Sequence, residues 1–175
     1  FAIGDLHLSL GSGKPMDIFG PVWENHTERL RENWNKTVAP DDTVVVPGDI
    51  SWAMHFEEAR ADFRFIESLK GNHDYWWQTN AKNRNFLESE GLRTITILFN
   101  DAVRAEDFIV CGTRGWFVDS AYSPEDDKIV EREAGRYRLS FQAAEKLQKQ
   151  YGGEILAFLH YPLCYGGVTC EKLAA

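Results

Sequence analysis

The sequence is poor in cysteine, contains no long hydrophobic run and carries no excess of positive charge. Its three cysteines, Cys111, Cys164 and Cys170, are odd in number and follow no ligand spacing, which favours a reduced, cytoplasmic protein. No apolar run approaches the ~20 residues that cross a bilayer, so we expect no membrane association. The net charge of -8 disfavours long nucleic acid, because nonspecific binding to it needs a cationic face.

The residues that are present are sufficient for one globular domain. Hydrophobic residues make up 43% and aromatic residues 13% of the 175 positions, which excludes a disordered chain. A chain of this length buries a substantial core, and we expect a single domain over residues 1–175. The sequence does not indicate an oligomeric state.

Helix-like and strand-like segments alternate along the chain. The apolar spacing predicts helices over residues 21–38, 56–69, 75–89 and 124–151, and short strands over residues 1–8, 43–47, 93–99, 107–113 and 154–161. Ser123 and Pro124 form a strong helix start, and Gly91 and Gly152 end helices. This alternation predicts an α/β or α+β protein with a covered sheet.

Polar side chains that could bind a metal follow several of these strands. They are Asp5 and His7 in "GDLH", Asp49 in "PGD", Asn72, His73 and Asp74 in "GNHD", and His160 in "FLHYP". Carboxylate, imidazole and amide groups suit divalent Mn, Fe, Zn or Mg. Each motif alone is more often structural, but the ordered set is improbable as unrelated turns.

These four blocks resemble the pattern of the calcineurin-like metallophosphoesterases, and "GDISWA", "KGNHDYWW", "GTRGW" and "HYP" resemble a bacterial branch of predicted phosphohydrolases. The resemblance implies a four-layer α/β/β/α sandwich with two divalent ions at the strand ends. It implies that Asp5 and His7 bind the first ion, Asp49 bridges both, and Asn72 and His160 bind the second. It further implies that His73 aids the leaving group and that Asp74 orients His73.

The chemistry of the residues agrees with these roles. Two divalent ions ~3.5–4 Å apart repel each other, so a shared carboxylate such as Asp49 is a natural bridge. Water held by both ions loses a proton near neutral pH and provides a hydroxide for attack on phosphorus. An imidazole at His73 could protonate the departing alkoxide.

Two further residues are candidates for binding the substrate. Arg114 could clamp a phosphate, because guanidinium matches phosphate oxygens in bidentate fashion, or could be an ordinary salt-bridged arginine. His55 could line the mouth of the site, but it could equally begin the helix at Phe56, which we favour.

The sequence departs from the family pattern at two places. "SLKG" leaves no room for the turn and buried strand expected before Asn72, and no Gly-His-x-His follows His160. We therefore expect residues to be missing near 69–71 and near 163–167.

The sequence thus predicts a phosphohydrolase that uses a metal-bridging hydroxide on a small phosphate ester. Two alternatives are a non-catalytic phosphate- or protein-binding module on the same fold, favoured by the missing histidines, and a nuclease, disfavoured by the acidic balance.

Overall fold

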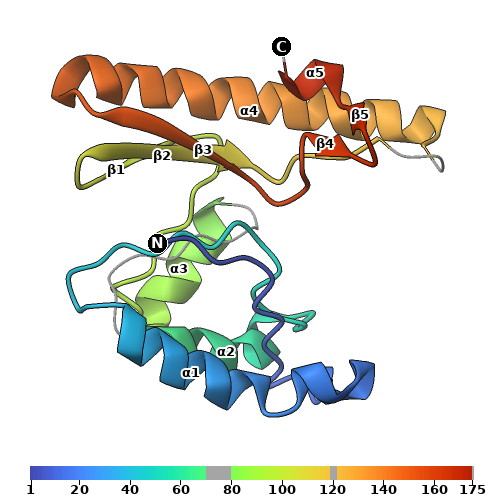
Figure 1. Cartoon of the computed structure of the whole chain (residues 1–175). Helices are drawn as coiled ribbons and strands as arrows, with labels where there is room; N and C mark the ends of the chain where they lie inside the picture. The colour runs from blue at the N-terminus through green and yellow to red at the C-terminus, as the bar shows by residue number, and fades with distance from the viewer. Residues whose placement is uncertain (70–79, 119–121, 175) are drawn as a thin grey trace. The chain divides into compact units, whose positions relative to one another are not determined.

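The structure, a computed structural model, describes residues 1–69, 80–118 and 122–174 (Figure 1). The chain divides into two compact units, Phe1–Ile97 and Leu98–Ala175, each of which is described by itself. Within the described ranges, no helix is both long enough and apolar enough to span a membrane. Helices and strands are mixed, which confirms the predicted α/β class, whereas the four-layer stacking stays a prediction.

The first unit is built from short helices and two extended segments. Its helical elements are η1 (Met16–Phe19), η2 (Pro21–Trp23), α1 (His26–Thr37), α2 (Phe56–Glu67) and α3 (Asn80–Glu90). The helix predicted from residue 21 begins at His26 instead, because Asn25 takes a left-handed backbone conformation with φ 52° that interrupts the helical path. Gly91, with φ 72°, ends α3 as predicted.

The predicted strands at residues 1–8 and 43–47 are present as two segments that run side by side in parallel. Isolated bridges join Ala2 to Val45 and Leu8 to Ser51. Between these bridges the pairing is interrupted, so neither segment forms a continuous strand. Both segments still contribute to the core, because Leu8 of the first and Val44, Val45 and Val46 of the second are buried.

The core of the first unit lies between these paired segments and the helices. Phe63 and Ile66 of α2 pack in one cluster with Leu6, Leu8, Trp34, Val44, Val46 and Ile50. The prediction of a strand over 93–99 is wrong, because the structure has no strand there. Ile95 and Ile97 are nevertheless both buried. The alternation of apolar residues therefore indicated correctly which side chains are buried, but it did not indicate that the backbone pairs with another strand.

The second unit is a small sheet covered by one long helix. Its elements are β1 (Val103–Ala105), β2 (Phe108–Thr113), α4 (Pro124–Tyr151), β3 (Glu154–Leu159), β4 (Cys164–Tyr165), β5 (Val168–Thr169) and α5 (Glu171–Ala174). The sheet order is β1-β2-β3, with β1 antiparallel to β2 and β2 parallel to β3. Because α4 connects the two parallel strands, this is a β-α-β unit whose strands end at the same edge.

The start of α4 confirms the helix signal at Ser123 and Pro124. The Asp126 carboxylate accepts hydrogen bonds from the Ser123 backbone N–H and hydroxyl, both at 2.8 Å. Hydrogen bonds from the Ser123 hydroxyl and backbone lower the pKa of Asp126. The helix then runs to Tyr151 and ends at Gly152, as the sequence predicts.

The segment after β3 forms a tight hairpin. Cys164 pairs with Thr169 and Tyr165 with Val168, which leaves only Gly166 and Gly167 in the turn. Both glycines have positive φ, 57° and 82°, as a two-residue hairpin turn requires. The residues expected to be missing near 163–167 stay a prediction, and those near 69–71 fall on a segment outside the described residues.

Candidate metal centre

Two loops of the first unit run side by side and carry the candidate ligands. The backbone N–H of His7 donates to the Asp49 carbonyl at 2.8 Å, and Leu8 N–H donates to the Ile50 carbonyl at 2.8 Å. The next bond along the same two segments runs from the Trp52 backbone N–H to the Leu8 carbonyl at 2.8 Å. These bonds hold the Asp5–His7 turn directly against the Asp49 turn.

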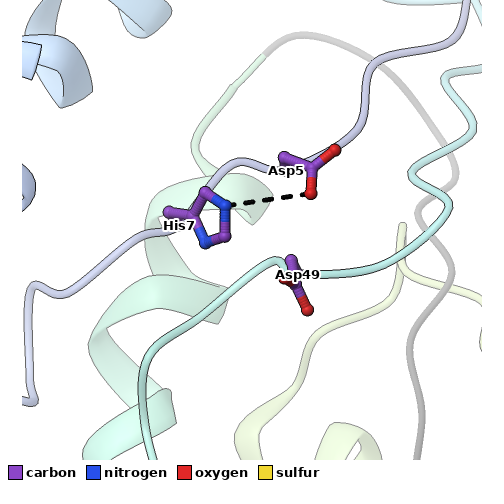
Figure 2. Close-up of side chains that lie close together, drawn as sticks. All are labelled: Asp5, His7 and Asp49. Atoms are coloured by element: carbon purple, nitrogen blue, oxygen red, sulfur yellow. Dashed lines mark ion pairs between the residues drawn. The ribbon is translucent and has the colours of Figure 1, made fainter. Parts of the chain in front are cut away.

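Side chains from the two loops converge at one place (Figure 2). One ligand atom each from Asp5, His7 and Asp49 lies within 4.8 Å of the others. The His7 Nε2 is 3.8 Å from an Asp5 carboxylate oxygen. The two carboxylates are exposed and His7 is partly buried, so the carboxylate ligand atoms are open to solvent.

The backbone at these three residues adopts an uncommon conformation. Asp5, His7 and Asp49 all lie in the left-handed region, with φ of 55°, 47° and 45°. Such a conformation costs about 1–3 kcal/mol for a residue that is not glycine and is concentrated at functional sites. Two carboxylates and an imidazole are also ligands that divalent Mn, Fe, Zn or Mg accepts. The donor set and the strained backbone therefore fit a divalent ion.

Aromatic side chains fix the ring of His7. Trp52 stacks on it, with ring centroids 5.5 Å apart and an angle of 28°. Trp23 meets the same imidazole edge-on at 6.0 Å. An imidazole packed between two indoles loses little further rotamer freedom when its nitrogen binds a ligand.

Beneath the two loops, Asp62 of α2 joins them to each other. One carboxylate oxygen accepts the Leu10 backbone N–H at 2.7 Å, and the other accepts the Ser51 hydroxyl at 2.5 Å. Asp62 is fully buried. Its desolvation raises the pKa of the carboxyl, and the hydrogen bonds from Ser51 and Leu10 partly offset that rise.

Asp62 was not predicted from the sequence, although a signal for it was available. Asp62 follows Ala59 by three residues and precedes Ile66 by four, so helical spacing places it on the apolar face of α2. An acid on such a face needs buried donors, and the two loops provide them.

Two other residues that were predicted to belong to the functional site lie at one edge of the sheet in the second unit. Arg114 directly follows β2 and His160 directly follows β3, and the last residues of these strands, Thr113 and Leu159, are paired. The Tyr161 backbone N–H also donates to the Arg114 carbonyl at 2.8 Å. Parallel pairing thus brings the predicted phosphate clamp and a predicted metal ligand to the same edge.

The remaining candidates differ in how far the structure describes them. His55 is the N-cap residue of α2 and is exposed, which agrees with the favoured interpretation that it begins that helix. Its role in substrate binding stays a prediction. Asn72, His73 and Asp74 lie outside the described residues, so their predicted roles stay predictions as well.

Comparison with known proteins identifies the family. The family model for calcineurin-like phosphoesterases matches residues 1–166, and the chain therefore belongs to that family. No curated protein matches the chain. The crystal structure of a protein of unknown function, AQ665 from Aquifex aeolicus, matches with 14% sequence identity over 90% of this chain and 88% of that chain, at a TM-score of 0.45. A likeness of that strength carries no conclusion about function.

Membership of this family makes the chain a phosphoesterase-type hydrolase, and the family binds divalent metals. The cluster of Asp5, His7 and Asp49 is a possible acidic and histidine site for such an ion.

Proposed function

We propose that this chain is a metal-dependent phosphohydrolase that cleaves a phosphomonoester or a phosphodiester. The convergence of Asp5, His7 and Asp49 carries this proposal, because their ligand atoms lie within 4.8 Å of one another on two adjoining loops. The family match over residues 1–166 supports the same chemistry. The substrate that we propose is a small phosphate ester, since a net charge of -8 disfavours long nucleic acid.

In this proposal, Asp5 and His7 would hold one ion, Asn72 and His160 would hold a second, and Asp49 would be a ligand to both. When bound, a pair of divalent ions (Mn, Fe, Zn or Mg) supplies Lewis-acid charge to the phosphate and lowers the pKa of a water molecule towards neutrality.

The other residues bind the phosphate and move a proton. The Arg114 guanidinium donates hydrogen bonds to phosphate oxygens. His73 donates a proton to the leaving oxygen, and Asp74 holds the imidazole in the orientation that this transfer needs.

A cytoplasmic location is part of the proposal. Cys111, Cys164 and Cys170 are all free thiols in the structure, which is the state that a reducing compartment maintains.

Hydrolysis of 4-nitrophenyl phosphate and of bis(4-nitrophenyl) phosphate tests the proposal. The full-length protein is stripped of metal and then reloaded with Mn²⁺, Zn²⁺, Fe²⁺ or Mg²⁺ in parallel. We expect turnover of at least one ester with at least one ion. Asp49→Asn should lower kcat/KM at least about 100-fold, because the amide carries no charge for the ions.

Asp41→Asn is the matched control, because Asp41 is an exposed acid eight residues before Asp49 on the same segment. We expect it to keep full activity. Calorimetric titration with Mn²⁺ gives a second measurement, in which Asp49→Asn should lose affinity. A protein that binds no divalent ion and cleaves neither ester would refute the proposal and favour a non-catalytic binding module.

A further inference from the structure

Three arginines surround one buried carboxylate in the second unit. Glu133 of α4 is 0% exposed. Its Oε1 lies 2.8 Å from Arg136 Nη1, 3.4 Å from Arg132 Nε and 3.7 Å from Arg114 Nη2. The other carboxylate oxygen, Oε2, accepts the Thr113 hydroxyl at 2.7 Å. All three cations therefore share a single oxygen atom of one side chain.

This arginine cluster, which consists of Arg114, Arg132 and Arg136, is unbalanced in charge. Three guanidinium groups face one carboxylate, and arginine stays protonated in proteins. Among the described residues, Glu133 is the only carboxylate that forms an ion pair with any of the three. Counted over the described part of the chain, the cluster thus has two more positive charges than its ion-paired carboxylate neutralises, although the net charge of the chain is -8.

The three arginine side chains are partly exposed, and aromatic rings restrict two of them. Their exposed fractions are 33%, 53% and 27% for Arg114, Arg132 and Arg136. Arg114 lies over the Trp116 ring at 4.9 Å, and Arg136 lies over the Phe99 ring at 5.3 Å. Aromatic contacts of this kind restrict a guanidinium without using its N–H groups.

Hydrogen-bond donors in the cluster outnumber the acceptors. Each guanidinium has five N–H donors, whereas Glu133 offers one oxygen to all three arginines. The Arg114 Nε is buried and has no hydrogen-bond partner among the described residues. A ligand with several acceptor oxygens and a negative charge would satisfy both the charge and the donors.

We propose that Arg114, Arg132 and Arg136 form a binding site for a phosphate group, either free or carried by the substrate. Phosphate matches the site because its oxygens accept bidentate hydrogen bonds from guanidinium groups. The position of Arg114 in the fold supports this proposal. Arg114 follows the end of β2 at the same sheet edge at which His160, a predicted metal ligand, follows the end of β3. Arg132 and Arg136, both on α4, are then phosphate-binding residues, and Glu133 is the carboxylate that competes with phosphate for all three guanidinium groups.

Binding of inorganic phosphate to the metal-free full chain tests this site without any appeal to catalysis. Calorimetry at low salt should give a Kd near the millimolar range, and raising the salt should weaken binding, because the guanidinium groups are partly exposed. Arg136→Gln should weaken binding about 10-fold or more, which is typical for losing a charge-assisted hydrogen bond. Arg138→Gln is the control, because Arg138 is exposed on the same helix and outside the cluster.

Glu133→Gln separates phosphate binding from a purely structural role. The glutamine keeps the shape of the side chain: its oxygen can face the guanidinium groups while its NH2 donates to the Thr113 hydroxyl oxygen, but it removes the one negative charge that competes with phosphate. Phosphate should bind about threefold or more tightly to this variant, because its cluster carries an additional net positive charge. Circular dichroism should show that each variant is folded before the Kd values are compared.

Three results would overturn the proposal: no phosphate binding by the folded metal-free protein at low salt, an unchanged Kd in Arg136→Gln, or weaker binding in Glu133→Gln. Any of them would leave the cluster as an internal ion-pair network.

A second experiment, which rests on the proposed function, tests whether the arginine cluster binds free phosphate or a phosphate group that is part of the substrate. The metal-loaded enzyme is given propyl phosphate or propane-1,3-diyl bisphosphate, which have similar leaving groups. If the substrate carries the bound phosphate, kcat/KM for the bisphosphate should be about 10-fold higher, and Arg132→Gln should remove that preference. Equal kcat/KM values together with normal phosphate binding assign the site to free phosphate. No turnover of either compound would count against the proposed function, while the calorimetric result stands independently.

Discussion

Replacement of Asp62 tests whether one buried carboxylate holds the two loops of the candidate metal centre together. Asp62→Ala removes the acceptors of the Leu10 backbone N–H at 2.7 Å and of the Ser51 hydroxyl at 2.5 Å. A buried donor left without a partner costs about 1–3 kcal/mol. Two fully buried donors would cost about 2–6 kcal/mol; both bonds here are part-buried, so we expect a loss in the free energy of unfolding near the lower end of that range, which is still a large part of the total for a domain of this size.

Urea denaturation of the metal-free protein at neutral pH measures this loss. Asp62→Asn should cost less than Asp62→Ala, because the amide retains one acceptor oxygen for one of the two donors. Asp41→Ala provides the exposed control and should change the free energy of unfolding by less than about 0.5 kcal/mol. A loss below about 1 kcal/mol for Asp62→Ala would refute the reasoning.

The same variants separate loop positioning from simple stability. Leu10 and Ser51 each lie within three residues of a candidate ligand, so Asp62→Asn should weaken Mn²⁺ binding about 10-fold or more in protein that is still folded. Unchanged Mn²⁺ affinity in a folded Asp62→Asn variant would show that Asp62 serves stability alone.

Three other predictions follow from buried or capping groups. Burial raises the pKa of the Cys111 thiol to about 11, so a thiol reagent at neutral pH should label exposed Cys164 and leave Cys111 unlabelled until the protein unfolds. Ser140→Ala should cost about 1–3 kcal/mol in urea denaturation, because the buried Ser140 hydroxyl accepts the Gly112 backbone N–H at 2.9 Å. The lowered pKa of Asp126 means that its contribution to stability is present above the ordinary value of 3.8 and is lost as the pH falls below it. Asp126→Asn should therefore show a smaller loss of stability on acidification than the unchanged protein, measured by thermal unfolding from pH 6 to pH 3.

Elements whose ends carry local signals could be predicted from the sequence. The helix from Pro124 to Tyr151 has a capping serine, a proline at its first position and a glycine after its last residue, and it was predicted to the residue. The strands β2 and β3 were predicted because each is an apolar run bounded by turn residues. These signals are local, so no knowledge of the tertiary contacts was needed.

The convergence of Asp5, His7 and Asp49 was predictable for a different reason. Short motifs at the ends of strands that pair in parallel are brought to one edge by the topology. The strained backbone at these residues was not predictable, because aspartate and histidine in a loop usually adopt φ below zero.

Features that depend on distant partners escaped the sequence analysis. The segment 93–99 has the alternation of a strand, but a strand also needs a partner for its backbone, which the sequence of one segment does not reveal. Glu133 was not singled out from the sequence, and its burial became evident only with Arg114 and Thr113 in place. Buried charges are defined by the groups that neutralise them, and those groups come from other elements.

The hairpin turn at Gly166 and Gly167 makes this end of the chain tolerant of insertion. Lengthening such a turn costs little entropy, about 0.6 kcal/mol for each doubling of loop length, provided that the flanking pairs such as Cys164 with Thr169 persist. A designer could therefore graft a longer, ligand-bearing loop between the two glycines and expect the β-α-β scaffold behind it to fold as before.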